Sequence, residues 1–546
     1  MFPRMPKPRI TSRTSSPATT STALGRSAAG AAPLCALLLV LTTAQTPPTL
    51  QAALALHTAG LARLGAHDPA TLETSGSMSG NKLDGRFHSW HDDRNDRFDQ
   101  ALGPRIERTY RLGDREFIVN MSGNVRELGG SLVARQVTQD FISSGDFVTQ
   151  PQYDTLLAPA TLPDGRGVVQ IRVAPPKGDV ETVSLDAKTG LIDQVSYVED
   201  DGISTISYDD YRVFHGALVP FVERDSNGDT AFDVSLHVEK VVVDRAIAPE
   251  VFAVPATSTI SNDAPVTVKL TYNDGHVYAP VTLRGRPYTF LVDTGAQAVF
   301  VDSTVATQNV LIPEGILEVS GARRSSALGI APLESIQIGG ATLPVGIVSV
   351  VDLASSTAGA FPIDGVLGYP FFASAEVRID FNRLTMTVGK PGSLPVQGDR
   401  VDLDTDRQLP ETSAAINGTR TKVLIDTGNS VELLVFNPFV QAHPGLIPFT
   451  GSHQISNYGV GGSTPAVGAN VDQLDLGPYK LYNRRANVML GSTGAFADRV
   501  DGGNVGLGTL QNFVVTFDLA NRAMYLLRAG TFDDGRYRAR YDTQIP

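Results

Sequence analysis

Polar and apolar residues alternate over much of the first half of the chain, in short runs separated by turn residues. Between residues 66 and 253, segments such as RTYRLGDREFIVNMSG and LIDQVSYVEDDGISTISYDDY show this alternation, which is typical of strands with one buried face. Gly113-Asp114 and Asn227-Gly228 stand where tight hairpins would reverse the chain. The pattern predicts one long antiparallel meander, with a helix over 131–144.

The second half of the chain contains two continuous apolar runs, Phe290-Leu291-Val292 and Val423-Leu424-Ile425. Runs of this kind suit strands that are buried on both faces. Each run leads directly into the tripeptide Asp-Thr-Gly, which places Asp293 and Asp426 at equivalent points. The glycine of each triplet allows the backbone to turn sharply just after the carboxylate.

The similarity between the two segments continues downstream. Each triplet is followed by a Gly-bearing hairpin and then by a second glycine loop, Val366-Leu367-Gly368 in the first half and Leu507-Gly508 in the second. Asp and Gly are common at strand-to-turn junctions, so one triplet alone would be weak evidence for a site. The repeated unit predicts two similar lobes, over residues 266–392 and 398–530.

With both elements present twice, residues 264–530 resemble the pepsin and retropepsin superfamily of aspartic peptidases, in the bacterial style of two fused retropepsin-sized lobes. The resemblance implies a mainly β fold, a bilobal double β-barrel of the acid-protease kind. It also implies an aspartic-type endopeptidase with Asp293 and Asp426 as its catalytic acids.

The chemistry of such a site needs two carboxyl groups. Held about 3 Å apart they cannot both ionise, so they share one proton. The ionised acid takes a proton from the attacking water and the other donates to the substrate carbonyl; the sequence does not decide which is which. By resemblance, Thr294 and Thr427 hydrogen-bond across the lobe interface, while Gly295 and Gly428 place backbone N–H groups near the carboxylates. No cofactor is expected.

Two positions depart from the pepsin-like pattern. The residue after each triplet is usually Ser or Thr, whose hydroxyl favours the ionised carboxylate, and here these residues are Ala296 and Asn429. Loss of that donor predicts a raised apparent pKa for the pair, unless the Asn429 amide replaces the hydroxyl.

Two hairpins compete for the role of the flap that closes over a substrate. The first, SGARRSSALG at residues 320–329, has no tyrosine near its tip. The second, SNYGVGGST, offers an aromatic side chain and mobile backbone through Tyr458, Gly459, Gly461 and Gly462. The sequence favours the second hairpin without excluding the first.

Composition narrows the class of partner. A chain of 546 residues suggests three or four compact units. Its net charge of −12 argues against nucleic acid or an anionic membrane surface as the partner. We therefore expect a polypeptide substrate and, because both acids lie on one chain, an active unit that is a monomer.

Residues 1–44 read as a signal peptide. A basic segment without acidic residues precedes the apolar run APLCALLLVLTTA, which is too short for a full membrane span. The only cysteine, Cys35, lies inside this run. A mature chain without cysteine favours a bacterial periplasmic or secreted protein, with an uncleaved membrane anchor as the alternative.

The unit over 66–253 has its own resemblance. The stretch from Val183 to Phe252, with its closing APEVFAVP, resembles the antiparallel half-barrel sheet of lipoprotein-carrier-type periplasmic proteins. Such a sheet curves around a helix (α+β) and implies a lipid or protein partner. The segment 254–265 is short and polar and is predicted to be a linker that lets the two units reorient.

A metal site is one reading of the segment FHSWHDDRNDRFD, through His88, His91, Asp92 and Asp93. Residues three apart on a strand face opposite sides, so the two histidines would not converge. We predict no metal site there.

Two functions remain after this reading. The first is an exported aspartic endopeptidase. The second is a periplasmic binding or carrier protein with a catalytically silent peptidase-like module. Both triplets are intact, which favours the enzyme.

Overall fold

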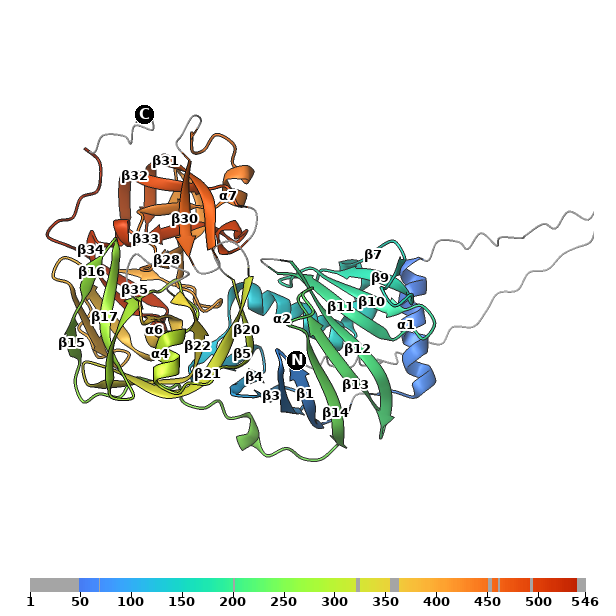
Figure 1. The fold of residues 1–546 in the computed structure, drawn as a ribbon. Helices are drawn as coiled ribbons and strands as arrows, with labels where there is room; N and C mark the ends of the chain where they lie inside the picture. Colours follow the sequence, from blue (N-terminus) through green and yellow to red (C-terminus); the bar gives the residue numbers. More distant parts are fainter. Residues whose placement is uncertain are drawn as a thin grey trace, which may run out of the picture.

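The computed structural model describes residues 49–67, 69–199, 202–320, 325–353, 363–449, 454–459, 462–491 and 494–537. The predicted signal peptide and Cys35 lie outside the described residues. Two units stand side by side in Figure 1, an N-terminal unit coloured blue to green and a C-terminal unit coloured green to red. Both are built mainly from strands, so the predicted mainly β fold is confirmed.

The N-terminal unit contains a 14-stranded sheet. Its strands run in the order β6 to β1 and then β14 to β9, so it consists of two antiparallel meanders joined through β1 and β14. Strand β7 continues the sheet beyond β9, and β8 also pairs with β9. The strands are β1 (Leu72–Gly80), β2 (Leu83–His91), β3 (Asn95–Leu102), β4 (Arg105–Leu112), β5 (Arg115–Val119), β6 (Val125–Glu127), β7 (Asp154–Leu156), β8 (Ala160–Thr161), β9 (Gly167–Val173), β10 (Glu181–Asp186), β11 (Ile192–Val198), β12 (Ile203–Phe214), β13 (Ala217–Ser226) and β14 (Val234–Val243).

Helices pack on one face of this sheet. Helix α2 (Gly130–Ser143) confirms the helix predicted over 131–144. With α1 (Leu50–Leu64) and α3 (Asp146–Thr149) it contributes to an apolar cluster that includes Leu54, Phe147 and Val183. Short 3-10 turns complete the unit, η1 (Pro151–Tyr153) and η2 (Pro249–Phe252). Among the described helices, none combines the length and the apolar character that a membrane crossing needs.

The C-terminal unit contains two sheets with the same strand order. The first follows β16-β17-β18-β23-β19-β22-β21-β20 and the second follows β27-β28-β33-β29-β32-β31-β30. Each closes on itself through an additional pairing, β17 with β21 and β27 with β31, so each forms a barrel. The repeat predicted from the sequence is therefore a structural repeat.

The bounds of the first sheet and its helices are β16 (Thr271–Asn273), β17 (His276–Leu283), β18 (Arg286–Val292), β19 (Phe300–Asp302), α4 (Ser303–Gln308), β20 (Glu314–Ser320), β21 (Ser325–Ile338), β22 (Ala341–Val351), β23 (Gly365–Leu367) and α6 (Tyr369–Ser374). Those of the second are β27 (Glu411–Ile416), β28 (Thr419–Asp426), β29 (Leu433–Val435), α7 (Asn437–Ala442), β30 (Gln454–Gly459), β31 (Gly462–Leu476), β32 (Tyr479–Met489), η3 (Ala495–Ala497), β33 (Asp501–Gly506) and α8 (Leu507–Leu510).

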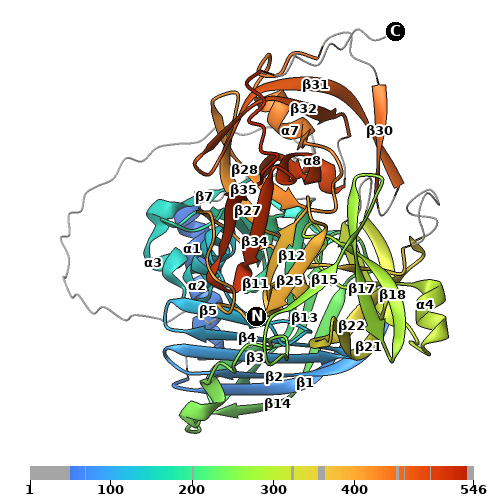
Figure 2. The ribbon, with the colours of Figure 1, turned by 90° about the vertical axis from the view of Figure 1, so that its left-hand side faces the viewer.

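A third sheet joins the two halves of the C-terminal unit. Its six strands follow the order β15-β25-β24-β34-β35-β26, and Figure 2 shows β25, β34 and β35 in one row. Strands from both halves meet at its centre, where Val377 of β24 pairs with Phe517 of β34. The elements are β15 (Val266–Lys269), β24 (Glu376–Asp380), β25 (Thr385–Gly389), β26 (Asp399–Asp402), β34 (Phe513–Asp518), η4 (Leu519–Asn521) and β35 (Ala523–Arg528).

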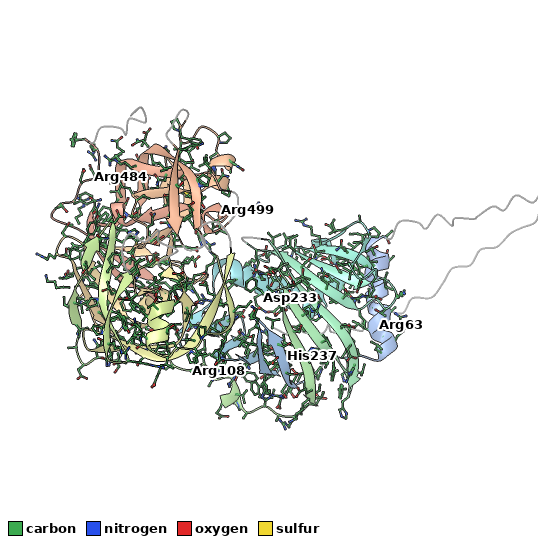
Figure 3. All side chains as sticks on the ribbon, viewed as in Figure 1. Arg63, Arg108, Asp233, His237, Arg484 and Arg499 are labelled. Atoms are coloured by element: carbon green, nitrogen blue, oxygen red, sulfur yellow. The ribbon has the colours of Figure 1, made fainter. Side chains whose placement is uncertain are left out.

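The chain after β35 returns to the second barrel. The backbone N–H of Tyr482 donates to the carbonyl of Asp534 at 2.6 Å. Arg484, labelled in Figure 3, is fully buried in this barrel, and its Nε donates to the Tyr482 carbonyl at 2.9 Å. The C-terminal segment thus closes one side of the second barrel.

The segment 254–265 is docked and is not a free tether, contrary to the prediction. Ile260 is fully buried in the core of the C-terminal unit, and its N–H donates to the Ser374 carbonyl at 2.9 Å. Asn124 of the N-terminal unit reaches the same Ser374, donating to its Oγ at 2.7 Å. Arg126 donates to the Asp406 carbonyl at 2.6 Å. These contacts fasten the two units together, because each would have to break before the units could reorient.

Candidate active site

The two Asp-Thr-Gly triplets meet between the two barrels. Strand β18 ends at Val292, directly before Asp293, and β28 ends at Asp426 itself. Phe290, Val292 and Ile425 are fully buried, so the apolar runs form interior strands as predicted. Their packing fixes the point at which each carboxylate leaves the sheet.

The two threonines hold the triplets together. The Thr294 hydroxyl donates to the Ile425 carbonyl at 2.7 Å and accepts from the Thr427 N–H at 3.0 Å. The Thr427 hydroxyl donates to the Val292 carbonyl at 2.8 Å and accepts from the Thr294 N–H at 3.1 Å. Both side chains are buried. The predicted bonds across the interface between the halves are present in both directions.

The two glycines bring backbone close to the acids, also as predicted. The Gly295 N–H donates to Asp293 Oδ1 and the Gly428 N–H to Asp426 Oδ1, each at 2.8 Å. Each glycine also lies under the carboxylate of the other half, because a Cβ atom added at Gly295 would stand 2.5 Å from Asp426 Cγ. No larger residue fits there without displacing an acid.

The carboxyl groups of Asp293 and Asp426 are hydrogen-bonded to each other. Burial raises the pKa of Asp293 well above its ordinary value, and the negative charge of Asp426 and their shared hydrogen bond raise it further. The N–H groups of Gly295 and Ala296 act in the opposite direction. A pair in this state retains one proton at a pH where isolated carboxyls have lost theirs.

A residue that the sequence reasoning missed contacts the pair. Asn504 is buried, and its Nδ2 donates to Asp426 Oδ2 at 2.6 Å. The Asn429 amide donates to Asn504 Oδ1 at 3.0 Å. Asn429 therefore supports the aspartate through Asn504, while in the first half Ala296 supplies no side-chain donor.

The register of the strands explains why Asn504 was missed. Val292 pairs with Leu367 in the first half, and Ile425 pairs with Val505 in the second. The counterpart of Gly368 is therefore Gly506, and the alignment of Gly368 with Gly508 was wrong by two residues. The corrected alignment places Asn504 opposite the strand that carries Asp426. A polar residue within the Gly-rich stretch GGNVGLG was the available signal.

Both halves form the hairpin that the flap requires. In the first half, β20 and β21 pair up to Ser320 and Ser325. In the second, β30 and β31 pair up to Gly459 and Gly462. Gly461 and the side chain of Tyr458 lie outside the described residues, so the choice between the hairpins stays a prediction.

The first hairpin is attached at its base to the N-terminal unit. The Ile316 N–H donates to the Asn81 carbonyl at 2.8 Å. Gly315 has φ of 58° and lies against the Leu83 side chain. The N-terminal unit thus contacts the peptidase-like unit at a hairpin that flanks the site.

The histidines considered for a metal site are engaged in separate pairs. His88 Nε2 lies 2.9 Å from Glu73 Oε1, and the His88 ring stacks on Trp90 with centroids 3.6 Å apart. His91 pairs with Asp96. Within the described part of the chain, no group of three or more His, Cys, Asp or Glu side chains is arranged to hold a metal ion.

Comparison with known proteins supports the first half of this site. A family model described as aspartyl protease matches residues 279–371. The match covers Asp293 and Gly368 and ends before Asp426. Among curated proteins, none matches the sequence.

One solved structure concerns the N-terminal unit. A "putative outer membrane lipoprotein-sorting protein domain" from Vibrio parahaemolyticus aligns over 36% of this chain and 95% of that chain. The two are 10% identical and the TM-score is 0.27. A likeness of this size says nothing about function.

Proposed function

We propose that the protein is an aspartic-type endopeptidase that hydrolyses peptide bonds with water activated between Asp293 and Asp426. The observation that carries the proposal is the interlocked pair of triplets, in which two hydrogen-bonded carboxyl groups are held by reciprocal threonine bonds. Two such lobes on one chain resemble fused retropepsin lobes, and one chain then suffices for activity.

The reaction follows from one shared proton. The water oxygen attacks the carbonyl carbon while the ionised acid takes a proton from the water. The protonated acid gives its proton to the carbonyl oxygen, which yields a tetrahedral diol. When the C–N bond breaks, one diol hydroxyl returns its proton and the amine leaves protonated, so the pair recovers its starting state. No metal or cofactor takes part in these steps.

The setting of the activity is proposed on weaker grounds. The apolar segment within residues 1–44 supports export to the periplasm or beyond. The net charge of −12 supports a polypeptide substrate over nucleic acid. A lipid or protein partner of the N-terminal unit remains a prediction.

The competing proposal is a carrier protein with a silent peptidase-like module. A module that has lost catalysis has no need to keep both acids and both glycines in contact. Here Gly295 and Gly428 each lie under an acid of the other half, which favours the enzyme.

The test is hydrolysis of denatured casein and of a peptide library between about pH 3 and about pH 8. The full chain is compared with Asp293→Asn and Asp426→Asn. Cleavage by the wild type and its loss in both variants support the proposal. Equal cleavage by a folded variant contradicts it.

A further inference from the structure

The two halves of the site are not chemically equivalent. Asn504 and Val366 occupy the same register position, each opposite the middle residue of the apolar run that precedes its triplet. Asn429 and Ala296 likewise hold the same place after the triplets. The second half thus has two side-chain amides where the first half has two hydrocarbon side chains.

The orientation of the amides follows from a backbone group. The Val431 N–H, which can only donate, lies 3.1 Å from Asn429 Oδ1. Asn429 therefore turns its Nδ2 towards Asn504 Oδ1, 3.0 Å away. Asn504 in turn must present its Nδ2 to Asp426 Oδ2, at 2.6 Å. A donor fixed in this way favours an ionised acceptor.

The first half offers the opposite environment. Val366 belongs to an apolar cluster with Phe300, and Ala296 and Leu328 pack against that cluster. Neither Val366 nor Ala296 has a side chain that can donate a hydrogen bond to Asp293. A carboxyl beside such side chains retains its proton to higher pH than one that receives an amide donor.

We propose that this asymmetry assigns the roles of the two acids. Asp426 is the ionised acid that takes the proton from water, and Asp293 carries the proton that goes to the substrate carbonyl. Asn504 is the positioning residue that sets this order, and Asn429 holds its amide in place. The catalytic meaning of the assignment rests on the proposed peptidase function.

The charged groups around the pair agree with this order. The ionisable group that faces Asp293 is Asp426, and burial together with that charge raises the pKa of Asp293. On the strands that carry Asp426 and Asn504, Lys422 and Asp501 pair with each other in register. Glu411 of β27 faces Lys422 and Arg407. These groups form their own network further back on the strands.

Chemical labelling tests the assignment without using proteolysis. A nitrophenyl glycidyl ether reacts with an ionised carboxylate, whose oxygen opens the epoxide ring to form an ester while solvent protonates the alkoxide. Peptide mapping by mass spectrometry then identifies the labelled aspartate in the full chain. We expect labelling at Asp426, with a rate that rises with pH as this acid ionises.

Two variants and one control make the test specific. Asn504→Val should move the midpoint of the labelling profile upward by about one to two pH units. Asn429→Ala should move it in the same direction by less, because Asn504 keeps its donor but loses its support. Asn512→Ala removes another buried asparagine of the second half, which donates to the Thr509 carbonyl, and should leave the midpoint unchanged.

Several results would overturn the inference. These are labelling of Asp293 in preference to or equally with Asp426, or an unchanged midpoint in the folded variants. If Asn504→Val does not fold, Asn429→Ala decides. No labelling of the folded wild type would also overturn it, because an ionised Asp426 open to water must react. Selective labelling of Asp426 without peptide hydrolysis would instead reject the proposed function and leave the assignment standing.

Discussion

The carboxyl group of Asp293 lies against the backbone of Gly428, in the space that the first side-chain carbon of any other residue would occupy. The reverse contact joins Asp426 and Gly295. Each acid is therefore seated on the glycine of the other half. The separation of the acids is set by backbone and not by flexible side chains.

Replacement of Gly428 by alanine should separate the pair. We expect Gly428→Ala to lose nearly all hydrolytic activity and about 1–3 kcal/mol of the free energy of unfolding, because the added methyl group must displace Asp293. Gly530→Ala is the matched control, since a Cβ there meets nothing within 4 Å. Urea unfolding and peptide hydrolysis measure both effects. Wild-type values for Gly428→Ala would show that the close seating is unimportant.

Loss of either acid should stop the reaction. Asp293→Asn and Asp426→Asn should each lower kcat by roughly a thousandfold or more, because neither acid can both take and give the proton alone. Circular dichroism checks that each variant keeps its fold. Substantial turnover by a purified variant would contradict a mechanism that needs both carboxyl groups.

The raised pKa of Asp293 also predicts a pH dependence of stability. The folded chain keeps this proton to higher pH than the unfolded chain, in which an aspartate titrates at about 3.9. Between these two pKa values the folded state binds more protons, so the wild type loses stability as pH rises above about 4. Asp293→Asn does not titrate and escapes this loss.

Its free energy of unfolding should therefore exceed that of the wild type by an amount that grows with pH and then levels off. Denaturant unfolding at a series of pH values measures the difference. A difference that is constant with pH would mean that Asp293 titrates normally in the folded chain.

The buried threonines should contribute to both stability and rate. Thr427→Val removes the bonds to the Val292 carbonyl and from the Thr294 N–H and should lower the free energy of unfolding by about 1–3 kcal/mol. Thr427→Ser keeps the hydroxyl and should recover most of the activity. Combining Thr427→Val with Thr294→Val should be less damaging than the sum of the two, because they share bonds. Additive losses would indicate that the threonines act independently.

The docked segment before β15 should matter for an isolated C-terminal unit. A fragment of residues 257–537 should be more stable than one of residues 264–537 by about 2–5 kcal/mol, because the longer fragment keeps the fully buried Ile260. Ile260→Ala in the longer fragment should reproduce much of the loss. Thermal unfolding compares the three. Equal midpoints would show that Ile260 packs on the N-terminal unit in solution and not on the core described above.

The sequence alone was sufficient for features that depend on local pattern. Asp293 and Asp426 were found because an apolar strand, a carboxylate and a glycine follow one another along the chain. The helix over 131–144 was found from its own periodicity. Each of these signals lies within one short segment.

Features that depend on register between distant strands were not accessible in this way. Asn504 reaches Asp426 only because β33 pairs in parallel with β28, and a shift of one residue would turn its side chain to the other face. Ile260 was read as part of a polar linker because its neighbours in the chain are polar. Its burial depends on Ser374 and Thr342, which lie far away in sequence.

The shared six-stranded sheet has a consequence for how the chain is made. Strand β34 is the partner of β24, and β35 carries β26 on its other edge, so the first half cannot complete its own sheet until the last strands have been synthesised. A nascent or truncated chain that ends before Phe513 has both aspartates but lacks the strands that bring the two barrels together. The cell is thereby protected from a partly made peptidase without a separate inhibitory segment.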